Sequence, residues 1–374
     1  MNVLIIGCGL SGAVLAERLA SIGKKVLIID KRDHIGGNCY DYVDENGILI
    51  NKYGAHLFHT NNETVWNYVN RFSDWIKYEH SVVGSVDGKL VPIPVNIDTV
   101  NLLLDAKIDD SKQMEEWLQE NANIYDTPQN GKEAAINRVG EKLYDKIFHH
   151  YTKKQWDKYP EELDRSVLER IPVRKDYEDR YFTDTYQALP KRGYTYLFER
   201  ILDNANIEIR LGCDDHEYKI LQQLQQFETT IFTGPIDHYF ANEGYPKLEY
   251  RSIRFEKETV MTPNNTHYQS NSVVNYPSPD VEFTRIVEYK HFLQQESEYS
   301  TIVKEYTTDH GDPYYPVPNE ENIELYERYK RLASKETVTR NVHFVGRLAN
   351  YKYFNMDQAI LNALNFFDEI KGTI

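Results

Sequence analysis

The sequence has few cysteines, no long apolar run and a shortage of basic residues. Its 374 residues include three cysteines (Cys8, Cys39 and Cys213), and no two of them form a C-x-x-C pair. This pattern excludes a disulfide framework and a zinc site of paired cysteines, so we expect no metal and a reducing, cytoplasmic location. No apolar run approaches the ~18 residues of a transmembrane helix, so we expect no membrane span. Because a strand-like run follows the first two residues directly, we also expect no signal peptide.

The charge balance argues against nucleic acid as a partner. There are 43 basic and 58 acidic residues, for a net charge of −15, whereas nucleic-acid binders are usually basic. The chain has 29 tyrosines against 15 phenylalanines. Tyrosine combines a flat apolar face with a polar tip, which suits nucleotide and sugar surfaces.

A glycine motif near the N-terminus predicts dinucleotide binding. Gly7, Gly9 and Gly12 fit G-x-G-x-x-G between an apolar strand at 3–6 and a helical pattern at 13–20. A second apolar strand at 25–30 ends in Asp30, where an acid can bind ribose hydroxyls. The alternative is a plain strand–helix turn, for which one glycine would suffice.

Two further elements favour FAD as the dinucleotide. Gly36, Gly37 and Asn38 follow Asp30 closely, which resembles flavoproteins of the amine-oxidase and glutathione-reductase types. Near the other end, a strand at 342–347 ends in Gly346-Arg347, and a helix opens near Asp357, like the second flavin-contacting element of those folds. Taken singly, Gly346 can also be an ordinary turn into a helix.

The middle of the chain predicts the chemistry of the substrate. Residues 144–196 contain eight of the 29 tyrosines, together with Trp156, Arg170, Arg174 and Arg180. Arginines bind phosphate through two hydrogen bonds and aromatic rings stack on bases or sugars, so we favour an anionic ligand such as a nucleotide-sugar. The alternative is that the tyrosines pack between domains and the arginines pair with Asp164, Asp176 and Asp179.

These patterns predict an α/β fold with an FAD-binding Rossmann-like domain, an inserted helical domain and an antiparallel β-sheet domain. We assign 1–80, 205–246 and 325–374 to the first, 98–180 to a helical substrate and lid domain, and 81–97, 181–204 and 247–324 to the antiparallel sheet. A tryptophan-rich helix is expected from about 62 to 80, and a hairpin around Asp87-Gly88.

Several longer motifs resemble bacterial UDP-galactopyranose mutases. They are GAHLFHT (54–60), YTKKQW (151–156), RIPVR (170–174), KRGYT (191–195), TGPID (233–237), PYYP (313–316) and YKYFNMD (351–357). The resemblance runs through the whole chain in order.

The resemblance implies an isomerase that interconverts UDP-galactopyranose and UDP-galactofuranose for cell-surface polysaccharide synthesis. It implies that the N5 of reduced FAD attacks the anomeric carbon, UDP leaves, and a flavin–sugar iminium forms before the ring closes again. It also implies a cytoplasmic homodimer. The rival interpretations are an FAD-dependent oxidoreductase of the amine-oxidase type and a nucleotide-binding sensor without turnover.

The resemblance also implies roles for individual residues. Catalytic roles fall on His59, Arg170, Arg285 and Tyr353. Substrate contacts fall on Phe148, Tyr151, Gln155, Trp156, Arg170, Tyr181, Asn275, Arg285, Tyr315, Tyr353 and Asn355, the last at a position where many relatives have an acid. Contacts to FAD fall on Gly7, Gly9, Ser11, Gly12, Asp30, Lys31, Gly37, Asn38, His56, His59, Thr233, Gly346, Arg347, Tyr353, Met356 and Asp357.

Overall fold

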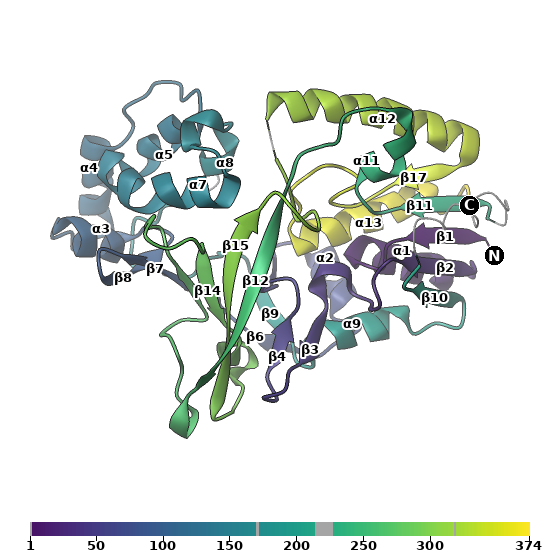
Figure 1. Cartoon of the computed structure of the whole chain (residues 1–374), viewed down its shortest axis with the longest axis horizontal. Helices are drawn as coiled ribbons and strands as arrows, with labels where there is room; N and C mark the ends of the chain where they lie inside the picture. The colour runs from purple at the N-terminus through teal and green to yellow at the C-terminus, as the bar shows by residue number, and fades with distance from the viewer. Residues whose placement is uncertain (1, 170–171, 214–226, 318) are drawn as a thin grey trace.

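The computed structural model describes residues 2–169, 172–213, 227–317 and 319–374. Figure 1 shows a parallel sheet with its helices at one end of the molecule, a group of helices at the other, and a long antiparallel sheet between them. Both chain termini lie in the parallel-sheet part (Figure 1). No helix among the described residues is long and apolar enough to cross a membrane.

Within the described residues, five strands form the parallel sheet, in the order β10–β2–β1–β11–β17. β1 (Val3–Ile6) lies between β2 (Val26–Asp30) and β11 (Thr229–Phe232), and the edges are β10 (Ile207–Leu211) and β17 (Val342–Phe344). The central strands are continuous apolar runs because both faces of a parallel sheet are buried.

Alternate residues of these strands enter two different cores. Ile5 and Ile28 pack with α1 (Leu10–Ser21), α9 (Gly193–Leu202) and α13 (Met356–Ile370). The intervening residues of β1 and β2 pack together on the opposite face of the sheet. This layered arrangement confirms the parallel α/β part of the predicted fold class.

A second sheet occupies the middle of the molecule, and the described chain contributes seven strands to it. Every neighbouring pair is antiparallel except β13 with β7. The hairpin predicted around Asp87 and Gly88 is confirmed, because β7 and β8 flank these two residues and their φ angles are 50° and 73°. In sheet order the strands are β16 (Tyr315–Pro316), β12 (Tyr250–Met261), β15 (Tyr299–Thr308), β14 (Arg285–Glu288), β13 (Val273–Asn275), β7 (Val82–Val86) and β8 (Lys89–Ile93).

The helical insertion packs directly on this sheet. Leu143 and Ile147 belong to one hydrophobic cluster with Val82 and Val287, so the helices and the sheet share a core. A positive φ of 77° at Gly140 separates two helices within the insertion. The elements are α3 (Ile97–Leu104), α4 (Ser111–Asn121), α5 (Gly131–Val139), α6 (Glu141–Leu143), the π-helix η2 (Tyr144–His149), α7 (His150–Trp156), η3 (Pro160–Glu162) and α8 (Ser166–Glu169).

Small elements connect the two sheets. A three-stranded sheet contains β5 (Phe58–Thr60), β9 (Tyr186–Pro190) and β6 (Trp75–Lys77), and β3 (Asp41–Val43) pairs with β4 (Leu49–Asn51). The remaining elements are η1 (Gly37–Cys39), α2 (Glu63–Val69), α11 (Ile236–Tyr239), η4 (Ala241–Glu243), η5 (Pro263–Asn265), η6 (Tyr289–Gln294) and α12 (Glu320–Arg340).

Two sequence-based expectations are wrong here. The helix expected at 62–80 ends at Val69, and Trp75 lies on β6, where its ring packs 5.0 Å from that of Phe58. Strand pairing with β9 overrides the local helical pattern. The assignment of 181–204 to the antiparallel sheet fails for α9, which packs in the core beneath the parallel sheet. The rest of the domain division stays a prediction.

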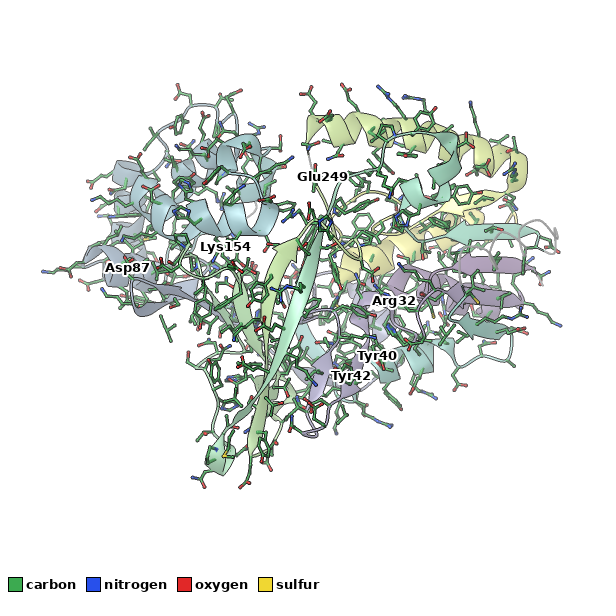
Figure 2. All side chains as sticks on the ribbon, in the orientation of Figure 1. Arg32, Tyr40, Tyr42, Asp87, Lys154 and Glu249 are labelled. Carbon is green, nitrogen blue, oxygen red and sulfur yellow. The ribbon has the colours of Figure 1, made fainter. Side chains whose placement is uncertain are left out.

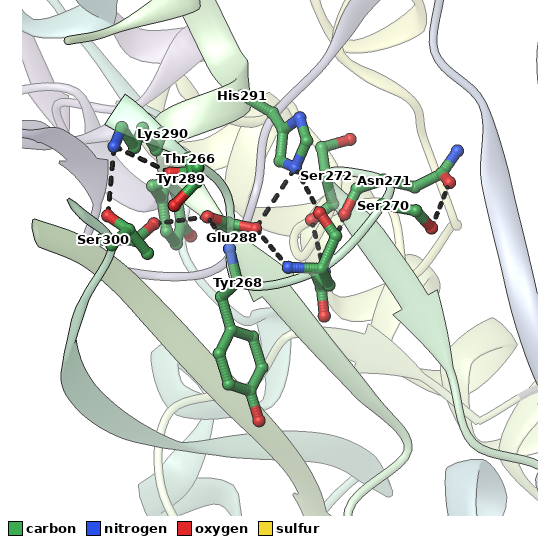
Figure 3. Close-up of polar contacts among 12 residues, drawn as sticks. Thr266, Tyr268, Ser270, Asn271, Ser272, Glu288, Tyr289, Lys290, His291 and Ser300 are labelled. Carbon is green, nitrogen blue, oxygen red and sulfur yellow. Dashed lines mark hydrogen bonds and ion pairs between the residues drawn. The ribbon is translucent and has the colours of Figure 1, made fainter. Parts of the chain in front are cut away.

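A buried carboxylate organises the end of the antiparallel sheet (Figure 3). Glu288 is fully buried, and its oxygens accept hydrogen bonds from Ser300 Oγ (2.6 Å) and from the N–H groups of Tyr268 and Gln269 (both 2.9 Å). His291 Nε2 lies 3.2 Å from the same carboxylate. Burial alone would raise the pKa of Glu288, but these donors lower it from 4.5 to about 2.

We expect Glu288→Gln to lower the melting temperature, because an amide nitrogen would face N–H donors in a buried site, at a cost of about 2–3 kcal/mol. Since the folded-state pKa lies below the unfolded value, the contribution of Glu288 is present above about pH 4.5 and is lost as the pH falls toward 2. Thermal melts of both proteins should therefore converge at acid pH. The exposed neighbour Glu296→Gln is the control, and an unchanged melting temperature for Glu288→Gln at pH 7 would contradict the assignment.

Candidate functional site

A cavity of about 1060 Å³ lies between the two large sheets and α7. Its lining runs from the glycine loop after β1 to the aromatic residues of the helical insertion. Single small-molecule sites usually measure ~300–1,000 Å³, so this cavity lies at the upper end of the range for ligand sites.

Close backbone approach builds the end of the cavity nearest the parallel sheet. A Cβ atom at Gly12 would lie 1.9 Å from the carbonyl oxygen of Gly7, and one at Gly37 would lie 2.8 Å from the Cα atom of Gly9. Glycine is therefore required at both positions. The 12-residue helix α1 begins here, with Gly9 as its N-cap and no side chain capping it. Its free N–H groups and dipole suit a pyrophosphate.

Asp30 fixes the loop beside this cradle. One carboxylate oxygen accepts a hydrogen bond from the Cys8 N–H at 2.7 Å, and the other accepts from the Arg32 N–H at 2.9 Å. Each oxygen retains a second lone pair for a ribose hydroxyl. Lys31 and Arg32 both pair with Asp312, at 3.0 and 2.8 Å.

Strand register builds the opposite wall. Asn275 on β13 lies across from Arg285 on β14, and Arg285 lies across from Glu305 on β15. Directly opposed residues share a face of a sheet, so these three side chains form one row, and all three line the cavity. Gly84, opposite Asn275, ends the row without a side chain.

Glu305 orients Arg285. The Nε of Arg285 donates to Glu305 Oε2 at 2.6 Å, and the Glu305 side chain is 2% exposed. No described residue accepts a hydrogen bond from the two terminal nitrogens of Arg285. Burial opposes the charge of Arg285, but Glu305 and the nearby Tyr151 and Tyr315 raise its pKa. The row therefore presents a fixed cation with unused donors.

A stack of rings and one arginine joins the two walls. Tyr315 and Tyr353 stack at 5.4 Å, and the guanidinium of Arg347 lies 5.0 and 4.6 Å from their ring centres. Among the described residues, Nε and Nη2 of Arg347 are buried without an acceptor. Burial raises the pKa of Tyr315 to about 12, so its hydroxyl stays protonated and can donate a hydrogen bond.

The helical insertion supplies the third wall. Phe148 lies in the π-helix η2, and Tyr151 and Gln155 follow on α7 at spacings of three and four residues, so they share one helix face. Trp156 is buried beside them, and all four line the cavity. Burial also raises the pKa of Tyr151, which keeps its hydroxyl a donor.

Two histidines lie where the cradle meets the sheet. His56 Nδ1 contacts the Gly54 carbonyl oxygen at 2.8 Å, and burial lowers the pKa of His56 to about 4. At neutral pH His56 is therefore uncharged and donates from Nδ1, which leaves Nε2 as an acceptor. His59 Nδ1 lies 2.9 Å from Asp184, and its ring stacks on Phe182 at 3.6 Å.

The cavity brings together most of the residues singled out from the sequence. Exceptions are Gly12 and Gly346, which pack the cradle from behind, and Asp357, which accepts a hydrogen bond from Thr60 at 2.9 Å. Arg170 lies outside the described residues. The predicted residues that line the cavity are Gly7, Gly9, Ser11, Asp30, Lys31, Gly37, Asn38, His56, His59, Phe148, Tyr151, Gln155, Trp156, Tyr181, Thr233, Asn275, Arg285, Tyr315, Arg347, Tyr353, Asn355 and Met356.

Asn355 has a structural role that the sequence pattern did not show. It is the N-cap of α13, and its own N–H donates to Gln358 Oε1 at 2.9 Å. Asparagine is among the preferred N-cap residues.

Sequence reasoning missed the partners that hold the predicted residues in place. Glu305, Asp312 and Asp184 pair with Arg285, Lys31 and His59, respectively. No sequence signal marked these partners. Glu305 follows Lys304 in the alternating strand pattern 300–306, and the other two lie in loops without periodicity.

Family models match two segments of the chain, and relatives match nearly all of it. The family model for UDP-galactopyranose mutase matches residues 146–353, and a model for the NAD(P)-binding Rossmann-like domain matches residues 5–72. A probable UDP-galactopyranose mutase from Klebsiella pneumoniae is 40% identical, covering 100% of this chain and 95% of that protein. A dTDP-fucopyranose mutase from Escherichia coli is 38% identical, covering 97% and 96%.

A solved structure has the same fold. The crystal structure of a reduced UDP-galactopyranose mutase superposes with a TM-score of 0.76, covering 100% of this chain and 94% of that one at 17% identity. At that identity the likeness shows the fold alone.

We expect Gly12→Ala to abolish retention of the dinucleotide, because a Cβ atom 1.9 Å from the Gly7 carbonyl would displace α1 from the cradle. The ratio of flavin absorbance to protein absorbance after purification measures this loss. Gly372→Ala is the control, since its Cβ would meet nothing within 4 Å. Full flavin content in a folded Gly12→Ala protein would contradict the placement of the cradle.

Proposed function

The chain belongs to the UDP-galactopyranose mutase family, and from this premise we propose that it interconverts UDP-galactopyranose and UDP-galactofuranose. The row of Asn275, Arg285 and Glu305, facing α7 across the same cavity that contains the dinucleotide cradle, carries this proposal. It supplies a diphosphate site beside a cofactor site.

FAD is the cofactor that the cradle and the family support. The glycine approaches, the N-terminus of α1, Asp30 and the unused donors of Arg347 fit a dinucleotide with a ring system that needs hydrogen bonds. When bound in its reduced form, FAD supplies an electron-rich nitrogen that can act as a nucleophile. The chain itself then has to bind the nucleotide-sugar, orient it and stabilise the leaving diphosphate.

Arg285 is suited to the leaving diphosphate. Negative charge grows on the diphosphate as its bond to the sugar breaks, and a fixed cation with unused donors stabilises that charge. Glu305 keeps the guanidinium oriented without covering its terminal nitrogens. We assign Tyr181, Tyr315 and Tyr353 as further hydrogen-bond donors to the diphosphate. The pocket for the base contains Phe148, Tyr151, Gln155 and Trp156. Arg170 stays a prediction from the resemblance.

The oxidoreductase interpretation is not favoured. The relatives that match the whole chain at 38–40% identity are named as mutases. The relatives named as oxidoreductases match 27% and 19% of the chain, and a putrescine oxidase shares the fold at 12% identity. The same named mutases argue against a sensor without turnover.

The relatives differ in the named substrate, since one acts on a dTDP-sugar and the other on a UDP-sugar. We propose UDP-galactose because the matching family model covers the segment 146–353, which contains α7 and the Arg285 row. A cytoplasmic location and a homodimer are further proposals. The three cysteines are free and buried, which supports a reducing compartment.

Activity should depend on the redox state of the cofactor without consuming electrons. We expect the dithionite-reduced protein to convert UDP-galactofuranose into UDP-galactopyranose over many turnovers, and the oxidised protein to be inactive. Chromatography of the nucleotide-sugars, run in parallel with dTDP-fucopyranose, measures the conversion and the substrate preference. A stoichiometric demand for reductant would support an oxidoreductase instead. Preferential turnover of the dTDP-sugar would contradict the assignment of UDP-galactose and would support dTDP-fucopyranose as the substrate.

Arg285→Ala should reduce kcat several hundred-fold while the flavin stays bound, because the loss of a charge-stabilising donor costs about 3–4 kcal/mol in the transition state. Steady-state kinetics with a thermal melt measures the effect. Arg254→Ala is the matched control, since Arg254 pairs with Glu256 on the exposed part of β12. Near-normal kinetics in Arg285→Ala would show that the Arg285–Glu305 pair is structural only.

A further inference from the structure

One lysine of α7 is enclosed by backbone carbonyl groups of the sheet. Lys154 Nζ donates to the carbonyl oxygens of Ser278 (2.8 Å), Phe283 (3.1 Å) and Val281 (3.2 Å), and also to that of Tyr276. All four carbonyls belong to the loop between β13 and β14. Figure 2 labels Lys154 where the helical insertion meets the sheet.

This environment is unusual for a lysine. Among the described residues, no carboxylate forms an ion pair with Lys154, so its ammonium is bound by carbonyl oxygens alone. Burial lowers the pKa of Lys154 to about 8, although Asp280 raises it, so the ammonium form predominates at neutral pH. The adjacent Lys153 differs, because its Nζ forms an ion pair with the Asp157 carboxylate (3.1 Å) and also donates to the Asp157 carbonyl at the end of its own helix (2.7 Å).

The enclosed ammonium joins two walls of the cavity. The loop that it binds begins after Asn275 and ends before Arg285, and both of these residues line the cavity. On α7, Tyr151 lies one turn before Lys154 and Gln155 follows it directly. Both of these residues also line the cavity.

A further hydrogen bond connects the backbone of Lys154 to β15. The carbonyl oxygen of Lys154 accepts a hydrogen bond from Thr307 Oγ1 on β15, two residues beyond Glu305. Lys154 therefore contacts the segments that carry Asn275, Arg285 and Glu305. Its own side chain does not line the cavity, so it acts through these neighbours and not on a ligand.

We propose that Lys154 is a positioning residue for the isomerisation. By holding the loop 276–284 against α7, its ammonium sets the distance between the base pocket (Tyr151, Gln155) and the diphosphate site (Asn275, Arg285). The inference rests on the proposed function, because these walls then hold the two ends of one nucleotide-sugar. The cofactor cradle lies on the parallel sheet, so it does not depend on Lys154.

Substitution of Lys154 distinguishes the contribution of its ammonium group from that of its aliphatic chain. Lys154→Met keeps an apolar stem but leaves four carbonyl oxygens without a donor, and misplaced binding groups can cost about 100-fold in rate. We expect kcat/KM to fall by about that factor while flavin content stays at the wild-type level. Lys153→Met is the matched control and should keep wild-type kinetics. Wild-type kcat/KM in Lys154→Met would overturn the inference.

Chemical rescue provides a readout that a packing role would not move. In Lys154→Ala, n-propylammonium chloride should raise kcat/KM at least tenfold, because it returns N–H donors to the carbonyl groups. The increase should saturate as the concentration of the salt rises. Tetramethylammonium chloride at equal ionic strength has no N–H donor and should not raise kcat/KM. Equal rescue by both salts, or by neither, would overturn the inference. If Lys154→Met does not fold, Lys154→Gln replaces it, with an expected loss of about tenfold, and a wild-type rate there overturns the inference.

The two proposals can fail separately. If wild-type protein turns over neither nucleotide-sugar, the proposed function fails, and calorimetric titration with UDP then tests Lys154 without turnover. A Kd for UDP raised about tenfold in Lys154→Met, but not in Lys153→Met, would support the positioning role. An equal Kd in all three proteins would overturn it.

Discussion

The pairing of Arg285 with Glu305 is the interaction on which the site depends. A carboxylate that is 2% exposed is stable in the middle of a sheet only when a cation binds it, and an arginine held at 2.6 Å by one nitrogen still has two nitrogens to offer. Strand register then places Asn275 next to Arg285. Residues of α7 line the same cavity. A shift of β14 by one residue would turn Arg285 to the opposite face and abolish the site.

The cofactor end follows a different constraint, which is the distance between backbones. At Gly12 and Gly37 there is no space for even one methyl group, so the loop after β1, the start of α1 and the segment after β2 form one surface of backbone groups. The two ends of the cavity are therefore specified differently. The cofactor end requires glycines, which have no side chain, whereas the substrate end requires charged and aromatic side chains in register.

The sequence predicted these two ends unequally. Glycine spacing between apolar runs identified the cradle because local geometry alone requires it. For the substrate end, composition indicated an anionic ligand with an aromatic part, and individual residues came from the resemblance to a family. The partners Glu305, Asp312 and Asp184 could not be found, since each meets its arginine or histidine only after distant segments pair. The same cause explains the wrong helix at 62–80, where pairing of β6 with β9 decides the conformation of Trp75.

The strand order of the parallel sheet has a consequence for biosynthesis. β1 is made first, yet one of its neighbours is β11, β11 pairs in turn with β17, and α1 packs with α13 in the same core. Arg347 and Tyr353 lie between β17 and α13. A ribosome that has released only the first half of this chain has therefore produced a glycine loop without the segments that complete its pocket. Contacts between such distant parts of a chain form slowly. The nascent protein consequently becomes competent for its cofactor only after β17 and α13 have been made, and the half-made sheet exposes apolar surface until then.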